Sequence, residues 1–163
     1  INNLNKLQED LERKTLIQDM LNHANMEFEI NEKMAYITDT GYIHENIQRF
    51  INNCDIYCIE SNHDPRLLML TKRPMFLKNR ILGATGHMSN QDCAYVLGNV
   101  IGPKTKEIVF LHRSREANTE EILMETFLFT MKKMNIDISN INIKIARQDE
   151  VVSFDKEQNL IKS

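Results

Sequence analysis

The sequence predicts an α/β protein, because short apolar segments with the length of strands alternate with longer helical segments. Three segments rich in β-branched and aromatic residues have this strand character: 55–60 "DIYCIE", 107–112 "EIVFLH" and 141–146 "INIKIA". Strands that are separated by helices are typical of a parallel sheet rather than of a bundle or a β-sandwich. The length of 163 residues suits one domain. Hydrophobic residues at 42% and charged residues at 26% indicate a globular chain rather than a disordered one.

The first element is a helix over residues 3–22, where leucines recur on one side among Lys, Glu and Gln. Next, 26–30 "MEFEI" and 33–38 "KMAYIT" are separated by Asn31 and Glu32, and this pattern predicts a hairpin. Beyond it, apolar periodicity and capping residues predict the remaining helices. These cover 43–52, stretches within 64–82, 90–100 beginning at Ser89-Asn90, and 118–134 with Asn118 or Thr119 as the cap.

Charge and cysteine content exclude several classes of protein. A net charge of -3 argues against a generally basic protein that coats nucleic acid, so any such contact is expected to be local. The chain has three cysteines, an odd number, and they lack CxxC spacing, which argues against a disulfide framework and a zinc ribbon. They are Cys54, Cys58 and Cys93. The sequence has no long apolar run and no signal-peptide pattern. We therefore expect a cytoplasmic protein that does not act at a membrane.

Polar and ionisable residues collect where three predicted strands end. "AYIT" is followed by Asp39-Thr40-Gly41, "IYCI" by Glu60-Ser61-Asn62-His63-Asp64, and "IVFL" by His112-Arg113-Ser114. Ligands of α/β sheets bind beyond the carboxyl ends of the strands, where loops bring side chains together. These three strand ends are therefore expected to converge on one site.

The residue types at these ends suit a divalent metal. Imidazole and carboxylate are the usual ligands of Zn, Mn and Fe, and a bound metal activates water for hydrolysis at neutral pH. His87 in 83–90 "GATGHMSN" follows two glycines and precedes a predicted helix, a place that suits contact with an anion.

Other interpretations of the same residues stay open at this stage. Asp39 before Thr-Gly is also typical of a simple turn, and "DTG" occurs in aspartic proteases, although Tyr42 follows here and the motif occurs once. His63 precedes a predicted N-cap, Asp64, with Pro65 at the first helical position. Arg113 beside His112 is either a phosphate contact or a solvated cation. The cysteines are interpreted as buried thiols.

Four motifs together resemble metallo-β-lactamase-fold hydrolases of the WalJ/YycJ type, over roughly residues 26–154. The motifs are "YITDTGY", "IESNHD", "LKNRILGATGHMSNQDCA" and "VFLHRSREANTEEI". The resemblance implies the C-terminal half of an αββα sandwich, a partial metallo-β-lactamase fold over residues 23–163. The helix at 1–22 precedes it and does not match the family.

The resemblance also implies roles for individual residues and a cofactor of one or two divalent metals, Zn or Mn. Asp39 resembles the metal-bridging aspartate, and His112 resembles the last histidine ligand. The remaining residues are expected to position the substrate or transfer protons. They are Glu60, Asn62, His63 and His87 as catalytic residues, and Ser89, Asn90 and Arg113 as substrate-binding residues.

The implied activity is that of a phosphodiesterase of the exonuclease-like branch, acting on nucleic acid or another phosphodiester. The family's H-x-H-x-D-H cluster, which supplies most ligands of one metal, is absent from these 163 residues. The alternative is therefore a catalytically inactive, truncated or split relative that acts as an interaction module. Its expected partner is a second copy of the chain or a complementing chain that supplies the missing half.

Overall fold

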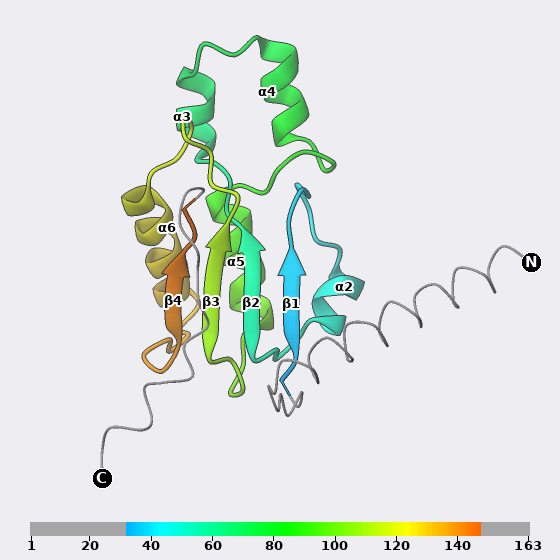
Figure 1. The fold of residues 1–163 in the computed structure, drawn as a ribbon, viewed down its shortest axis with the longest axis vertical. Helices are drawn as coiled ribbons and strands as arrows, with labels where there is room; N and C mark the ends of the chain where they lie inside the picture. The colour runs from blue at the N-terminus through cyan, green and yellow to red at the C-terminus, as the bar shows by residue number, and fades with distance from the viewer. Residues whose placement is uncertain (1–31, 148–163) are drawn as a thin grey trace, which may run out of the picture. The chain divides into compact units, whose positions relative to one another are not determined.

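The computed structural model describes residues 32–147, and these form a parallel sheet with helices between its strands (Figure 1). The four strands lie in the order in which they occur in the sequence. They are β1 (Met34–Ile37), β2 (Ile56–Glu60), β3 (Glu107–Leu111) and β4 (Asn142–Ile145). All neighbouring strands pair in parallel, so the carboxyl ends of the strands lie at one edge. This edge carries the candidate site.

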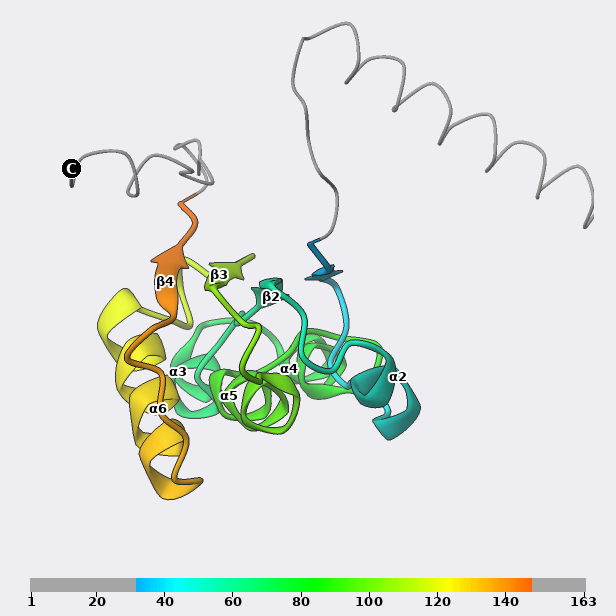
Figure 2. The same ribbon diagram turned by 90° about the horizontal axis from the view of Figure 1, so that it is seen from below.

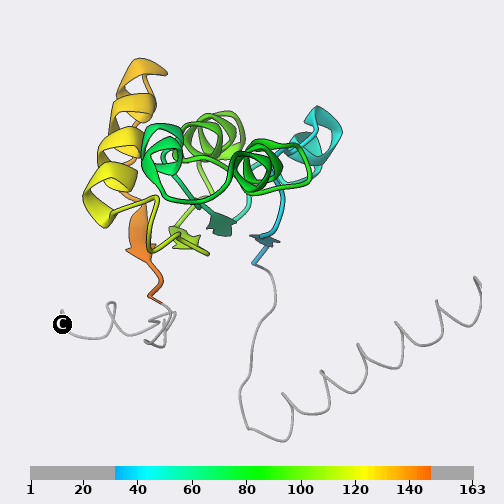
Figure 3. The same cartoon turned by 90° about the horizontal axis from the view of Figure 1, so that it is seen from above.

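The helices connect these strands. They are α2 (Glu45–Phe50), α3 (Pro65–Leu70), α4 (Met75–Leu82), α5 (Asn90–Val100) and α6 (Glu120–Lys133). Figures 2 and 3 show α2, α5 and α6 on one face of the sheet, and Figure 1 shows α3 and α4 beyond the carboxyl ends of the strands. The connection from β2 to β3 therefore carries two helices over the edge where the candidate site lies.

Local chemistry explains where the helices begin. The side chains of Ser89 and Thr119 accept hydrogen bonds from the first turns of α5 and α6, and Asp64 does the same for α3, with Pro65 at the first helical position. Each cap satisfies backbone N–H groups that have no partner within the helix.

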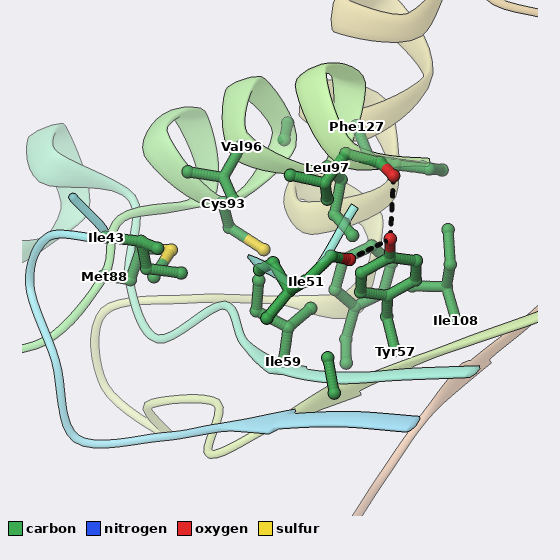
Figure 4. Close-up of a cluster of buried hydrophobic side chains, with 14 of the residues drawn as sticks. Ile43, Ile51, Tyr57, Ile59, Met88, Cys93, Val96, Leu97, Ile108 and Phe127 are labelled. Atoms are coloured by element: carbon green, nitrogen blue, oxygen red, sulfur yellow. Dashed lines mark hydrogen bonds between the residues drawn. The ribbon is translucent and has the colours of Figure 1, made fainter. Parts of the chain in front are cut away.

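The core lies between the sheet and the helices that cover it. Tyr57 and Ile59 of β2 and Ile108 and Phe110 of β3 point into it. Figure 4 shows the buried Tyr57 hydroxyl within this cluster. Its one hydrogen is shared between the carbonyls of Ile51 and Val100, each 2.7 Å away, and Cys54 N–H donates to its oxygen at 3.0 Å. The ring of Tyr57 therefore adds buried apolar area to the core, and its hydroxyl is not left without a hydrogen-bond partner.

The structure confirms the α/β class and the predicted helices and strands between residues 43 and 146. A sheet with helices on one face is the arrangement expected of half an αββα sandwich. The predicted helix at 3–22 and the first hairpin strand at 26–30 lie outside the described residues. In the part that is described, β1 pairs with β2, and no helix there is long and apolar enough to cross a membrane.

Candidate metal centre

Three side chains from different loops meet at the carboxyl edge of the sheet. Asp39 follows β1, His112 follows β3, and His87 lies in the loop between α4 and α5. One potential ligand atom from each residue lies within 4.8 Å of the others. We call Asp39, His87 and His112 the donor cluster. Two imidazoles and a carboxylate fit Zn or Mn, and catalytic zinc sites commonly have three protein ligands.

Glu60, at the end of β2, holds the two histidines of this cluster. Its side chain is fully buried. Its Oε1 lies 2.8 Å from His87 Nδ1 and 3.1 Å from His112 Nδ1, and its Oε2 accepts a hydrogen bond from Thr40 N–H at 3.3 Å. The same two Nδ1 atoms also lie 3.7 Å and 3.6 Å from Asp39 Oδ1, so one nitrogen of each ring faces both carboxylates. Glu60 therefore fixes the orientation of both rings next to Asp39, as carboxylates that bond to metal-binding histidines do.

Two members of the donor cluster have a left-handed backbone. The φ angle is 56° at Asp39 and 53° at His112. Such angles are uncommon for residues other than glycine, and strain of this kind collects at functional sites. The bond from Asn62 Nδ2 to the His112 carbonyl, at 2.7 Å, helps to hold the second turn. The turn expected at Asp39 is thus present, and it carries a donor group.

Two glycines allow the loops of the site to approach each other. A Cβ on Gly41 would lie 2.1 Å from the Gly83 carbonyl oxygen, and one on Gly86 would lie 2.2 Å from that of Ile81. Gly86 is followed by His87, whose N–H donates to the same Ile81 carbonyl at 2.9 Å. Gly86 therefore sets the position of the histidine that follows it.

A buried polar network supports the segment after β2. Asn118 Nδ2 donates to the carbonyls of Ser61 and Asn62 and to Asn90 Oδ1, and Ser61 Oγ donates to the same Asn90 oxygen at 2.7 Å. Ser89 is buried and caps α5 while its hydroxyl donates to Asp92. Ser89 and Asn90 are therefore buried and hydrogen-bonded within this network, and the substrate-binding role predicted for them stays a prediction.

His63 also lies away from the open part of the site. Its ring is buried, and neither of its nitrogens has a hydrogen-bond partner among the described residues. Burial, and after it the neighbouring His87, lowers the pKa of His63, against the opposing effect of Asp92 and Asp64. A buried imidazole with a lowered pKa is uncharged at neutral pH. The catalytic role predicted for His63 stays a prediction.

A cavity of about 690 Å³ opens beside the donor cluster and is lined by four arginines. Asp39, Asn62, His87 and His112 also line it. We call it the arginine cavity. Its arginines are Arg73 and Arg80 from the α3–α4 region and Arg113 and Arg115 from the segment after β3.

The arginines differ in their contacts. Arg73 pairs with Glu116 at 2.9 Å, and Arg113 reaches Glu120 at 3.6 Å and the Asn118 carbonyl at 3.4 Å. Arg80 is exposed, and its guanidinium can therefore turn toward a ligand. Sequence reasoning singled out Arg113 but missed Arg73 and Arg80, because no spacing rule indicates that α4 lies over the strand ends.

The cysteines are placed as expected. Cys54, Cys58 and Cys93 are free and buried. Burial, and after it Glu107, raises the pKa of Cys58 to about 11, and burial raises that of Cys93 as well. Thiols that stay protonated are poor nucleophiles and poor metal ligands.

The comparisons with known proteins agree with the motifs. No family model matches the sequence. Over 92 residues the chain is 38% identical to the exodeoxyribonuclease YycJ of Bacillus anthracis, a match that covers 56% of this chain and 35% of that protein. Over 108 residues it is 32% identical to the exodeoxyribonuclease WalJ of Streptococcus pneumoniae serotype 2, covering 66% of this chain and 40% of that protein.

A solved structure is also similar. The metallo-beta-lactamase fold protein YhfI from Bacillus subtilis aligns with a TM-score of 0.46 and 14% identity, covering 72% of this chain and 38% of that one. The chain spans between 35% and 40% of the length of the curated relatives described above. Within that part, its sequence is similar to exodeoxyribonucleases of the WalJ/YycJ type, which confirms the resemblance that its motifs predicted.

Proposed function

We propose that this chain contributes to a metal-dependent hydrolase that cleaves phosphodiester bonds in DNA. The observation that carries the proposal is the donor cluster of Asp39, His87 and His112 beside a cavity that is lined by four arginines. Arginine binds phosphate oxygens through paired N–H groups. The names of the curated relatives, exodeoxyribonucleases, support DNA as the substrate and removal of nucleotides from an end as the mode of action.

Each residue of the site has a proposed task. Asp39, His87 and His112 hold the metal, and Glu60 orients both imidazoles through its contacts with their Nδ1 atoms. His87 thereby takes a metal-binding task, where the sequence had indicated substrate positioning or proton transfer. Arg80 and Arg113 bind the phosphates, and Asn62 fixes the turn that carries His112.

The cofactor is proposed to be Zn or Mn, because imidazole and carboxylate donors suit both. When bound, such a cation supplies Lewis-acid activation of water and of a phosphoryl oxygen. The donor cluster can hold one metal, and a second would need donors beyond these three residues. We propose a cytoplasmic location, which the free thiols of the three cysteines support.

A second candidate is an interaction module that is completed by another chain. It is favoured by the donor cluster, which among the described residues offers ligands for one metal. A complementing chain or a second copy would then provide the remaining metal ligands. In that case the residues described here form one half of a shared site.

One experiment separates these candidates. Metal binding is measured by calorimetry with Zn²⁺ and Mn²⁺, and cleavage is measured on end-labelled single- and double-stranded DNA. The variants are Asp39→Asn and His112→Asn, because asparagine tolerates the left-handed backbone at both positions. The control is Asp137→Asn, since Asp137 is exposed between α6 and β4, outside the donor cluster, and asparagine keeps the oxygen that accepts from Ser139 N–H.

We expect the wild-type chain to bind one metal per chain and to release nucleotides from a DNA end. Both asparagine variants should lose both properties, and the control should keep them. Stoichiometric metal binding without cleavage would favour the interaction module. A wild-type chain that binds no metal would contradict the proposal that these residues form a metal centre by themselves.

A further inference from the structure

A second, smaller cavity lies close to the donor cluster and differs from the arginine cavity in its chemistry. Its volume is about 180 Å³. Between α2, α5 and the loop after β1, it is lined by Gly41, Tyr42, Ile43, Glu45, Gln48, Met88, Asp92, Tyr95, Val96 and Asn99. We call it the tyrosine pocket. None of these lining residues is a lysine or an arginine.

The two tyrosines present aromatic surface to this pocket. Tyr42 is 58% exposed and Tyr95 is 59% exposed, so both rings have free surface for a ligand. Tyr42 is also held in place. Its ring packs edge-on against His44 with centroids 6.3 Å apart, and its carbonyl accepts a hydrogen bond from Thr40 Oγ1 at 2.8 Å. A prepositioned aromatic ring loses little freedom when a ligand stacks on it.

The polar groups of the pocket suit an uncharged ring that carries amino and carbonyl groups. Glu45 and Asp92 supply carboxylates, which accept hydrogen bonds and repel phosphate. Gln48 and Asn99 supply amides, which both donate and accept, and Asn99 Nδ2 lies 3.4 Å from Gln48 Oε1. A nucleobase has this combination of a flat aromatic face and edge groups that donate and accept hydrogen bonds.

The tyrosine pocket is tied to the donor cluster by two short connections. Gly41 lies two residues after Asp39, and Met88 follows His87 directly. Consecutive Cα atoms are about 3.8 Å apart, so the lining of the pocket begins within about 8 Å of the donor residues along the chain. Thr40, between Asp39 and Gly41, donates its N–H to Glu60. A nucleotide whose phosphate lies at the donor cluster can therefore place its base near the pocket.

We infer that the tyrosine pocket binds the base of a nucleotide next to the phosphate that is cleaved, with the base stacked on Tyr42 or Tyr95. This inference rests on the proposed function, because it assigns the base and the phosphate of one DNA strand to two neighbouring cavities. The arginine cavity takes the phosphates, which every nucleotide carries. The tyrosine pocket takes the base, so that the enzyme engages a strand whose end is unpaired.

The test compares two fluorescent oligonucleotides of equal length by anisotropy, with Mn²⁺ present. One is a single-stranded oligothymidylate, and the other has the same backbone with abasic sites throughout. Both carry phosphorothioate linkages that resist hydrolysis. The proteins are the wild-type chain, a double variant with Tyr42→Ala and Tyr95→Ala, and a matched double variant with Tyr42→Phe and Tyr95→Phe that keeps both rings. Arg80→Ala serves as the variant of the arginine cavity.

Stacking of a base on an aromatic ring predicts that the wild-type chain binds the thymidylate at least about fivefold more tightly than the abasic strand. The alanine double variant should lose this preference, and the phenylalanine double variant should keep it. Arg80→Ala should weaken the binding of both strands alike.

Different results contradict the base pocket and the proposed function. Equal binding of both strands by the wild-type chain, or a preference that survives the alanine double variant, would overturn the base pocket and leave the proposed function standing. A wild-type chain that binds neither strand would contradict the proposed function, and the base pocket with it.

Discussion

The substitution Glu60→Gln removes the negative charge behind both histidines and keeps the size of the side chain. Glu60 is fully buried, and one of its oxygens lies 2.8 Å from His87 Nδ1 and 3.1 Å from His112 Nδ1. The amide oxygen of glutamine can take the place of Oε1 and still accept from both Nδ1 atoms, but it carries no full negative charge, and the NH₂ group then faces the Thr40 N–H as donor to donor. The hydrogen bonds that orient both imidazoles are therefore weakened, and they are lost if the amide turns its NH₂ group toward the rings to relieve the clash with Thr40 N–H.

The magnitude follows from these two contacts. A hydrogen bond to a charged group contributes about 1.5–3 kcal/mol. Loss or weakening of one such bond corresponds to roughly a 10- to 100-fold loss of metal affinity, the range found when carboxylates behind metal-binding histidines are replaced. Glu60→Gln should therefore weaken Zn²⁺ or Mn²⁺ binding by about that factor, although Glu60 itself is not one of the three donors.

Calorimetric titration with each metal measures this effect, and circular dichroism checks that the variant is folded. Glu125→Gln is the matched control, because it makes the same chemical change at an exposed position of α6. Unchanged metal affinity in a folded Glu60→Gln variant would refute the role assigned to Glu60. A loss of the same size in Glu125→Gln would show that the effect is not specific to the site.

Three further predictions follow from the packing of the site. Gly86→Ala should destabilise the protein by about 1–3 kcal/mol and weaken metal binding, because its Cβ would lie 2.2 Å from the Ile81 carbonyl oxygen. Gly83→Ala, where the nearest atom is 3.4 Å away, should do neither. Asn118→Ala should cost about 1–3 kcal/mol in the free energy of unfolding, because it removes the side-chain donor of the buried Ser61 carbonyl, whereas the Asn62 carbonyl keeps the Ser114 N–H. The pKa of His63 is lowered in the folded state, so as the pH falls this imidazole is protonated at a higher pH in the unfolded chain than in the folded one. The free energy of unfolding should therefore fall as the pH drops below about 6.5, and His63→Leu should make this fall shallower.

Urea unfolding curves measure all three effects, at pH 7.5 and 5.5 for His63. Equal stability of the two glycine variants would contradict the close approach at Gly86. An Asn118→Ala variant as stable as the wild type would show that the buried network contributes little. A pH profile that is the same with and without His63 would contradict the uncharged state assigned to this residue.

Much of the fold could be predicted from the sequence because its signals are local. Thr119 caps α6, Asp64 and Pro65 begin α3, and the apolar run at 55–60 becomes β2 in the middle of the pairing order. Strand ends in a parallel sheet lie at one edge, so the meeting of Asp39, Glu60 and His112 also followed from the order of the elements.

The remainder depends on contacts between distant residues. Polar residues near a site look alike in sequence whether they face a ligand or support a loop, and Ser89 and Asn90 turned out to be buried. His87 reaches the donor cluster through a turn that Gly86 allows, and Arg80 reaches the cavity because α4 lies over the strand ends. Neither the hydrophobic periodicity nor the spacing of motifs in the sequence indicates such placements.

The central claim is that Asp39, His87 and His112 bind a metal together, and X-ray absorption spectroscopy of the zinc-loaded chain tests it most directly. We predict one zinc per chain with two imidazole nitrogens at about 2.0–2.1 Å, together with oxygen donors. Asp39→Asn and His112→Asn should each change this spectrum, and Asp137→Asn should not. A zinc spectrum without imidazole scattering, or one that none of these variants changes, would contradict the claim.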